Sequence, residues 1–436
     1  MLIIREILLR EVTNLIDLHI HSTASDGTDA PEIIAKKIAA ESGIKIFALT
    51  DHDTINGVEK IQFAIPADIF FINGVEFSCK TALGYKCHIL AYFYDSTNEE
   101  FQKILQQGKN LHQEKLFTRL NFLAELYGIN FSESEVAELS QNEVVGKPHI
   151  VNFVVEKFGI AKEKIYADLE NCKTKSSRLD ARAVIDAIKS AGGVAVWAHP
   201  LGGEGETFLT HADFQTRLEE LIDFGIAGLE CYYSRYDNEQ EKFLAETAQK
   251  NNLYISGGSD YHGKNKNISL GELGTEKPAV KIFQLTILKK IFEYHKNLRV
   301  RKAFEIAKKA HAGQVDKAGV NYIFHPMTVA FQCGGDDSAI IVALLHDVAE
   351  DTNLTIENLR DEINLTAEEV LALKILTHDK NIPYFEYIQK IKTNSLATKV
   401  KIADLKNNSD LSRISLPTEK DLSRVEKYQR ALQILK

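Results

Sequence analysis

Short apolar runs alternate with helical patterns over the first two thirds of the chain. Most of the runs are separated by stretches whose apolar residues recur with the 3.6-residue period of a helix, the longest at 98–127. Strands that alternate with helices are typical of a parallel β/α architecture. The apolar runs that have the length of buried strands lie at 15–18, 44–49, 69–75, 85–93, 193–197 and 253–256.

The pattern changes after residue 277, where strand-like runs stop and every later apolar pattern is helical. The chain of 436 residues has room for two or three domains. We therefore predict an α/β domain at 1–277 with a helical insertion at about 96–180, a linker helix at 278–296 and an all-helical domain at 297–436.

Residue types that bind metals recur next to the predicted strands. His19 and His21 point the same way, because side chains alternate along a strand, and Asp26 lies in the loop that follows. A bare His-x-His is equally consistent with a solvated strand face, but similar groups accompany the other runs. Because the carboxyl ends of parallel strands meet on one face, the pattern predicts a divalent-metal centre there. The further groups are His52, Glu76, His88, His199, Asp260 and His262.

These motifs resemble those of the polymerase and histidinol phosphatase (PHP) phosphoesterases over about residues 14–277. The matching segments read DLHIHSTASDG, TDHD, GVE, AHP and SDYHG, together with His88. The resemblance implies a distorted (β/α)7 barrel with up to three Mn²⁺, Zn²⁺, Fe²⁺ or Mg²⁺ ions. It assigns one metal to His19, His21, Glu76 and Asp260, a second to Glu76, His88 and His199, and a third to Asp26, His52 and His262. His262 is also the candidate to assist the leaving oxygen.

Within the family, the likeness is strongest to the branch that hydrolyses nucleoside 3′,5′-bisphosphates and trims RNA 5′ ends. That branch carries Gly-Arg-Pro-His in a helical insertion, where this chain has Gly-Lys-Pro-His at 146–149. Lys147 keeps the positive charge of that arginine but lacks the planar guanidinium, which can bind phosphate through two hydrogen bonds. We expect Lys147, Arg178 and Arg235 to contact phosphate, although Arg178 could lie on a solvated face and Arg235 could pair with an acid. His149 could contact substrate or cap a helix.

The helical part has a second group of candidate ligands. His325 opens one apolar helix, His346 and Asp347 end another, and Asp404 lies in a third. Charged groups inside apolar helices need partners. Nitrogen and carboxylate donors of this kind suit one Mn²⁺ or a similar cation.

Residues 298–415 resemble the HD-type hydrolase domain of the stringent-response alarmone enzymes. The matching segments read AHAGQVDKAGVNYIFHP, ALLHDVAEDT, LTHDK and VKIADLKNN. The resemblance implies removal of pyrophosphate from the 3′ position of ppGpp or pppGpp. It assigns His325, His346, Asp347 and Asp404 to the metal, Glu350 and Asp351 to the attacking water, and Lys317 and Asn408 to substrate.

One position departs from that family. Asp316 stands where those enzymes carry an arginine that stacks on guanine. A carboxylate cannot stack in this way and repels phosphate, so recognition of guanine is open. The helical domain could accordingly be a second hydrolytic site or a non-catalytic nucleotide sensor that regulates the barrel.

The composition and net charge limit the kinds of molecule that the protein is expected to bind. The net charge of −9 argues against coating of long double-stranded nucleic acid, which needs a basic surface. Five scattered cysteines without a C-x-x-C motif are typical of reduced thiols in a cytoplasmic protein, and no apolar run is long enough to span a membrane. We expect a bifunctional metal-dependent phosphohydrolase acting on phosphorylated nucleotides or short RNA ends, with its oligomeric state undetermined.

Overall fold

The computed structural model describes residues 16–66, 68–140, 144–203, 208–275, 280–411 and 418–436. It divides the chain into two compact units. The first contains Met1–Ile65 and Phe71–Ile287, and the second contains Pro66–Phe70 and Leu288–Lys436. No helix among the described residues has the length and apolarity that a membrane span requires.

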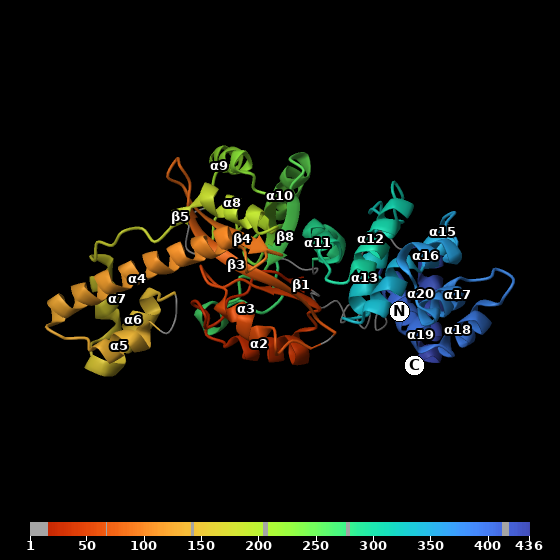
Figure 1. The fold of residues 1–436 in the computed structure, drawn as a ribbon, viewed down its shortest axis with the longest axis horizontal. Coiled ribbons are helices and arrows are strands. Elements are labelled where there is room, and N and C mark those ends of the chain that lie inside the picture. The colour runs from red at the N-terminus through yellow and green to blue at the C-terminus, as the bar shows by residue number, and fades with distance from the viewer. Residues whose placement is uncertain (1–15, 67, 141–143, 204–207, 276–279, 412–417) are drawn as a thin grey trace. The chain divides into compact units, whose positions relative to one another are not determined.

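The first unit is a nearly closed barrel of strands in the order β1-β2-β3-β4-β6-β7-β8 (Figure 1). The Leu18 amide donates to the Gly257 carbonyl at 3.2 Å, and Ile20 bridges Tyr261, which brings the first strand against the last. The predicted distorted (β/α)7 barrel is confirmed. The strands are β1 (Ile16–Asp17), β2 (Ile46–Leu49), β3 (Phe70–Lys80), β4 (Lys86–Tyr92), β6 (Val194–Trp197), β7 (Gly228–Tyr233) and β8 (Tyr254–Gly258), and the short β5 (Leu179–Asp180) pairs with β3.

β3 and β4 depart from a regular parallel barrel. They form an antiparallel pair from Gly74–Tyr92 to Lys80–Lys86, and β4 is also antiparallel to β6. The prediction that β3 ends at Val75 is therefore wrong, because the pairing with β4 carries the strand past the polar Glu76. Reversal of β4 also places the start of that strand, with His88, beside the end of its antiparallel neighbour β6.

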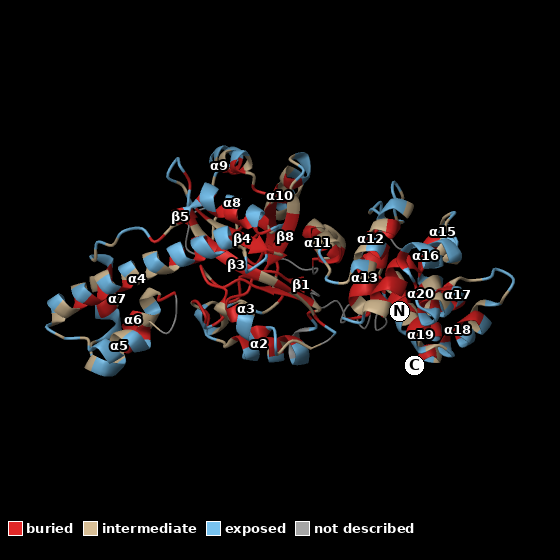
Figure 2. Cartoon of the chain, viewed as in Figure 1, coloured by how far each residue is buried: buried red, intermediate tan, exposed pale blue. Residues whose placement is uncertain are grey.

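Helices cover the barrel, and the strands between them are buried (Figure 2). Pro31 begins α2 in a first-turn position, as expected from its fixed φ. The chain then ends this helical segment at Gly43, with φ of 69°. The barrel helices are α2 (Pro31–Lys37), α3 (Asn56–Ile61), α8 (Ala181–Ser190), α9 (His211–Phe224) and α10 (Asn238–Lys250).

The predicted helical insertion lies between β4 and β5 and consists of α4 (Glu99–Tyr127), α5 (Glu133–Leu139), α6 (Lys147–Phe158) and α7 (Lys162–Glu170) (Figure 1). The capping box predicted at Ser132 and Glu135 begins α5. These helices bury a cluster of their own, which includes Leu120, Ile150 and Ile165. His112 of α4 bonds Asp53 at 2.8 Å and ties the insertion to the loop after β2.

The predicted linker segment contains several short helices in place of one. Its first residues lie outside the described part of the chain. Two 3-10 helices, Ile282–Gln284 and Thr286–Leu288, precede α11 (Lys289–Glu293). Gln284 donates to the Tyr232 hydroxyl, and the Thr286 hydroxyl accepts the Ile255 amide, both at 2.9 Å. These bonds to β7 and β8 hold the segment against the barrel and interrupt a regular helix.

The second unit is all-helical, as predicted. Its central helix α14 buries every residue from Ala339 to Leu345 and packs against α12, α13, α17 and α19. The helices are α12 (Leu298–Ala310), α13 (Phe324–Gln332), α14 (Asp337–Leu345), α15 (Val348–Asp351), α16 (Ile356–Ile363), α17 (Ala367–Leu376), α18 (Tyr384–Lys392), α19 (Ser395–Ser409) and α20 (Glu419–Leu435).

Asp17 joins the two sides of the barrel seam. Its carboxylate accepts the Ser259 amide at 2.9 Å, the Ser259 hydroxyl at 2.6 Å and the Gly271 amide at 2.7 Å. Close approach at the seam also requires Gly258, because a Cβ there would lie 2.4 Å from the His19 nitrogen. The seam positions the loops that follow β1 and β8, and those loops carry His19, His21 and Asp260.

We predict that Asp17→Ala lowers the free energy of unfolding of the barrel by about 3 kcal/mol, because buried donors lose their acceptor. Urea unfolding followed by fluorescence measures this, since Trp197, the single tryptophan, is buried in β6. The control Asp186→Ala changes an exposed acid on α8 and shifts stability by at most about 0.5 kcal/mol. Equal stability of both variants contradicts the role of Asp17.

Candidate metal centres and the substrate cavity

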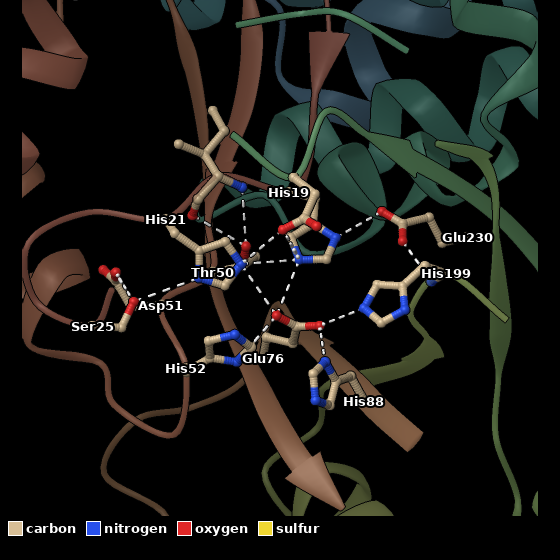
Figure 3. Close-up of polar contacts among 12 residues, drawn as sticks. His19, His21, Ser25, Thr50, Asp51, His52, Glu76, His88, His199 and Glu230 are labelled. Carbon is tan, nitrogen blue, oxygen red and sulfur yellow. Dashed lines mark hydrogen bonds and ion pairs between the residues drawn. The ribbon is translucent and has the colours of Figure 1, made fainter. Parts of the chain in front are cut away.

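The first predicted group converges at the end of β1 (Figure 3). The Nε2 atoms of His19 and His21 lie 3.1 Å apart, and Glu76 Oε2 lies 3.2 Å from the first and 3.1 Å from the second. Asp260 Oδ1 lies 3.5 and 3.3 Å from the same two nitrogens. All four side chains are buried. The geometry matches four donors around one cation, since ligand atoms about 2.0–2.2 Å from a metal lie a little over 3 Å from one another.

The other Glu76 oxygen faces a second group. Glu76 Oε1 lies 2.9 Å from His88 Nδ1 and 3.1 Å from His199 Nε2. His52 Nδ1 lies 3.2 Å from Glu76 Oε2. One buried carboxylate therefore stands between two groups of imidazoles, in the position that the resemblance implies for a bridging ligand (Figure 3).

The third group gathers around Asp26 in the loop after β1. Asp26 Oδ1 lies 3.2 Å from His262 Nε2, and Asp26 Oδ2 lies 4.0 Å from His52 Nε2. His262 Nδ1 lies 2.8 Å from the Asp260 carbonyl, to which an N–H there donates, so its Nε2 keeps the lone pair. His199 and Asp260 have φ of 29° and 59°, a strained backbone region that often occurs at functional sites.

The protonation states of Glu76 and His88 suit cation binding. Burial opposes ionisation of Glu76, but His19, His52 and His88 hold its pKa well below the usual value. Burial lowers the pKa of His88 to about 4, which keeps that imidazole neutral. Nδ1 of His52 and Nδ1 of His88 are buried and face Glu76 without forming a hydrogen bond. Buried imidazole nitrogens that lack a hydrogen bond and lie beside an ionised carboxylate fit bound divalent ions.

Two carboxylates that the sequence reasoning missed hold this centre in place. Glu230 accepts His19 Nδ1–H at 2.9 Å with one oxygen and the His199 amide at 2.7 Å with the other. Asp51 accepts the Ser22 amide and the Ser25 hydroxyl, both at 2.7 Å, and so fixes the loop that carries Asp26. A single acid within the apolar strand β7 was the available signal for Glu230, because buried acids need partners.

A cavity of about 330 Å³ opens beside the metal-binding groups. Its wall contains His52, Glu76, His88, His199 and Asp260, together with four cationic side chains. These are Lys86, Arg178, Arg217 and Lys266, of which Arg178 was predicted. The cations make the cavity suitable for a phosphorylated ligand.

The other predicted phosphate contacts do not line this cavity. Lys147 pairs with Glu170 of α7, and Arg235 lies outside the cavity wall. His149 caps α6, since its Nδ1 accepts the Gly146 amide at 3.0 Å, and its contact with substrate stays a prediction.

The second predicted centre lies within the helical unit. His325 Nε2 lies 3.2 Å from Asp347 Oδ2 and 3.4 Å from Asp404 Oδ1, and His346 Nε2 lies 3.2 Å from Asp347 Oδ1. Contacts on the far sides orient the rings: His325 Nδ1 bonds Asn407, and His346 Nδ1 bonds the Ala343 carbonyl. His346 Nε2 is buried without a hydrogen-bond partner, which fits a bound cation.

Carboxylates and amides surround this centre. Glu350 accepts the His378 amide at 3.3 Å, and Asn408 donates to Asp404. Burial and the nearby Asp347 raise the pKa of Asp351. Lys317 lies 3.5 Å from Asp421, with its side chain largely exposed.

Asp316 has a local structural role. Its Oδ1 accepts the Ala318 amide at 2.8 Å and the Val320 amide at 2.9 Å. The carboxylate therefore closes the turn at 316–320.

Comparison with known proteins identifies both parts. A family model described as PHP domain matches residues 17–145. A 5′-3′ exoribonuclease of Haemophilus influenzae is 30% identical over 267 residues, which cover 60% of this chain and 94% of that protein. A phosphoribosyl 1,2-cyclic phosphate 1,2-diphosphodiesterase of Eggerthella lenta is 26% identical over 257 residues, covering 57% and 94%. The chain belongs to the PHP family.

A solved structure of a metal-dependent phosphoesterase from Bifidobacterium adolescentis matches with a TM-score of 0.52 and 25% identity, covering 65% of this chain and 97% of that one. A family model described as HD domain matches residues 303–378. In that region, a guanosine-3′,5′-bis(diphosphate) 3′-pyrophosphohydrolase of Aquifex aeolicus is 43% identical over 65 residues, which cover 14% of this chain and 9% of that protein. The protein is thus a PHP phosphoesterase-type hydrolase with an HD domain similar to those of ppGpp hydrolases.

We predict that Glu230→Gln weakens divalent-metal binding at the barrel about 10- to 100-fold, because His19 loses the acceptor that orients it. Titration with Mn²⁺ measures this best in an Asp347→Asn background, so that the helical unit does not contribute. The control Glu219→Gln changes an exposed acid on α9 and leaves affinity unchanged. Unaltered affinity of Glu230→Gln contradicts the orienting role.

Proposed function

We propose that the protein is a bifunctional nucleotide phosphohydrolase. The PHP domain hydrolyses a phosphomonoester or terminal diester of nucleoside 3′,5′-bisphosphates or of short RNA 5′ ends. The HD domain removes a 3′-diphosphate from a (p)ppGpp-like nucleotide. The observation that carries the proposal is the convergence, in each unit, of buried imidazole and carboxylate donors. Among the described residues, His52 Nδ1, His88 Nδ1 and His346 Nε2 at these points have no hydrogen-bond partner.

In the barrel, up to three ions would be held by the predicted ligand sets, with Glu76 shared between the first two. Bound divalent ions lower the pKa of a coordinated water and stabilise charge on phosphoryl oxygens. Arg178, fixed by the Cys79 and Cys87 carbonyls at 3.4 Å, presents its guanidinium to the phosphate in the cavity. His262 is the proposed group that assists the leaving oxygen.

In the helical unit, His325, His346, Asp347 and Asp404 would hold one Mn²⁺ ion. Lys401, 2.8 Å from Asp404 Oδ2, balances the charge of that ligand. Glu350 and Asp351 would orient the attacking water and accept its proton. The raised pKa of Asp351 supports this role, because a carboxylate with a higher pKa is a stronger base. Asn408 and Lys317 remain proposed substrate contacts.

A second candidate function for the HD domain is nucleotide sensing without turnover. The observation that favours it is the turn around Asp316, whose carboxylate bonds two backbone amides and places a negative charge where the resembling enzymes carry a cation. A nucleotide other than guanine would suit this loop better. Bound nucleotide would then change the activity of the barrel.

The test is turnover by the full-length protein with Mn²⁺. Candidate substrates are adenosine 3′,5′-bisphosphate, a 5′-phosphorylated oligoribonucleotide and ppGpp. We predict that Asp260→Asn abolishes hydrolysis of the first two and leaves ppGpp hydrolysis intact, while Asp347→Asn has the opposite effect. Each loss exceeds the about 10- to 100-fold effect typical of groups that only orient ligands.

The same variants separate the two candidate functions of the HD domain. If Asp347→Asn leaves every hydrolytic activity intact but removes a response of the barrel to added nucleotide, the HD domain is a sensor. Release of no phosphate, no pyrophosphate and no mononucleotide from any of the three substrates contradicts the proposed function.

A further inference from the structure

Besides the metal-binding groups, the cavity wall contains Arg217 of α9 and, at the start of β4, Lys86 and Cys87. Lys86 and His88 lie two residues apart on β4, so both side chains leave the same face of the strand, about 6.7 Å apart along it. Lys86 thus extends the site away from Glu76 toward the hairpin between β3 and β4. Arg217 of α9 joins it there, with its guanidinium 4.6 Å from the centre of the Tyr85 ring.

Packing fixes the position of Arg217 in advance. The Leu83 amide at the hairpin tip donates to Glu220 of α9 at 3.1 Å, which ties the two elements together. Phe214, one turn before Arg217 on α9, stacks on Trp197 at 5.4 Å with the rings 8° from parallel. A preordered cation loses little entropy when it binds a ligand.

Arg217 lacks acceptors of the kind that Lys266 and Arg178 have. Lys266 pairs with Asp260 at 2.6 Å, and Arg178 bonds two backbone carbonyls. Arg217 Nε is buried without a hydrogen-bond partner, and no acid of the described chain forms an ion pair with this guanidinium. A buried donor without an acceptor is costly, so the arrangement suits an anion supplied by a ligand.

We propose that Arg217 and Lys86 form a second anion subsite, which holds the uncleaved phosphate of a substrate that carries two phosphates. The proposal rests on the proposed function of the barrel and makes it more specific. The phosphate to be cleaved lies at the Glu76 centre beside Arg178. The second phosphate, one ribose away, meets the planar fork of Arg217, whose geometry matches phosphate oxygens. The barrel then prefers nucleoside bisphosphates and 5′-phosphorylated RNA over simple monophosphates.

The test compares adenosine 3′,5′-bisphosphate with the adenosine monophosphate (3′ or 5′, written AMP here) that carries only the phosphate the barrel removes. Both are offered as substrates to the full-length protein loaded with Mn²⁺. Arg217→Gln is expected to lower kcat/KM for the bisphosphate about tenfold or more, mainly through KM, since a charge-assisted hydrogen bond is lost. Its kcat/KM for AMP stays within about twofold of the wild type. Arg217→Lys restores part of the preference, because the charge returns without the fork.

The matched control is Arg182→Gln. Arg182 also lies over an aromatic ring, that of Phe224 at 4.3 Å, but it is exposed on α8 and outside the cavity wall. This variant keeps the wild-type ratio of the two kcat/KM values. Equal losses on both substrates in Arg217→Gln, or no loss on either, would overturn the subsite.

If the wild type cleaves neither nucleotide, the proposed function fails and the subsite is still decided by binding. Calorimetric titration of adenosine 3′,5′-bisphosphate into the Mn²⁺-loaded wild type and Arg217→Gln gives the answer. Weaker binding by the variant supports the subsite, and equal binding, or no binding by either protein, overturns it.

Discussion

The structure around the barrel's metal-binding groups depends on the charge of one buried carboxylate, that of Glu76. Glu76 is almost fully buried, and its two oxygens face imidazoles that come from β1, β2, β4 and β6 or the loops after them. A carboxylate in such a place is stable only with positive charge beside it. Three features bring those donors to Glu76. They are the antiparallel direction of β4, the hydrogen bonds of Asp17 at the seam, and the strained backbone at His199 and Asp260.

The helical unit meets the same constraint with different elements. Asp404 is buried on α19, and it is balanced by Lys401 on the same helix and by the imidazoles of His325 and His346. In both units a hydrogen bond on the far side of a histidine fixes which nitrogen keeps its lone pair: Glu230 does this for His19, and Asn407 does it for His325. Two unrelated architectures thereby present similar donors for chemistry at phosphorus.

Residue types and their placement next to apolar runs were enough to predict a parallel β/α domain, a helical unit and a metal-binding group in each. The barrel itself was predicted from the resemblance to the PHP family. Local patterns could not show what depends on distant partners. The extension of β3 past Glu76 depends on its pairing with β4. Arg217 lines the cavity because the packing of α9 places its side chain beside Tyr85. Lys147 and Arg235 were expected on the basis of resemblance and position along the chain, whereas tertiary packing leaves both outside the cavity wall.

The most direct test of the account is a crystal structure of the full-length protein grown with Mn²⁺, with anomalous diffraction recorded at the manganese edge. The account predicts strong peaks on both sides of the Glu76 carboxylate and one peak among His325, His346, Asp347 and Asp404. An anomalous map without peaks at either place, in which the same imidazoles and carboxylates bond directly to one another, would contradict it.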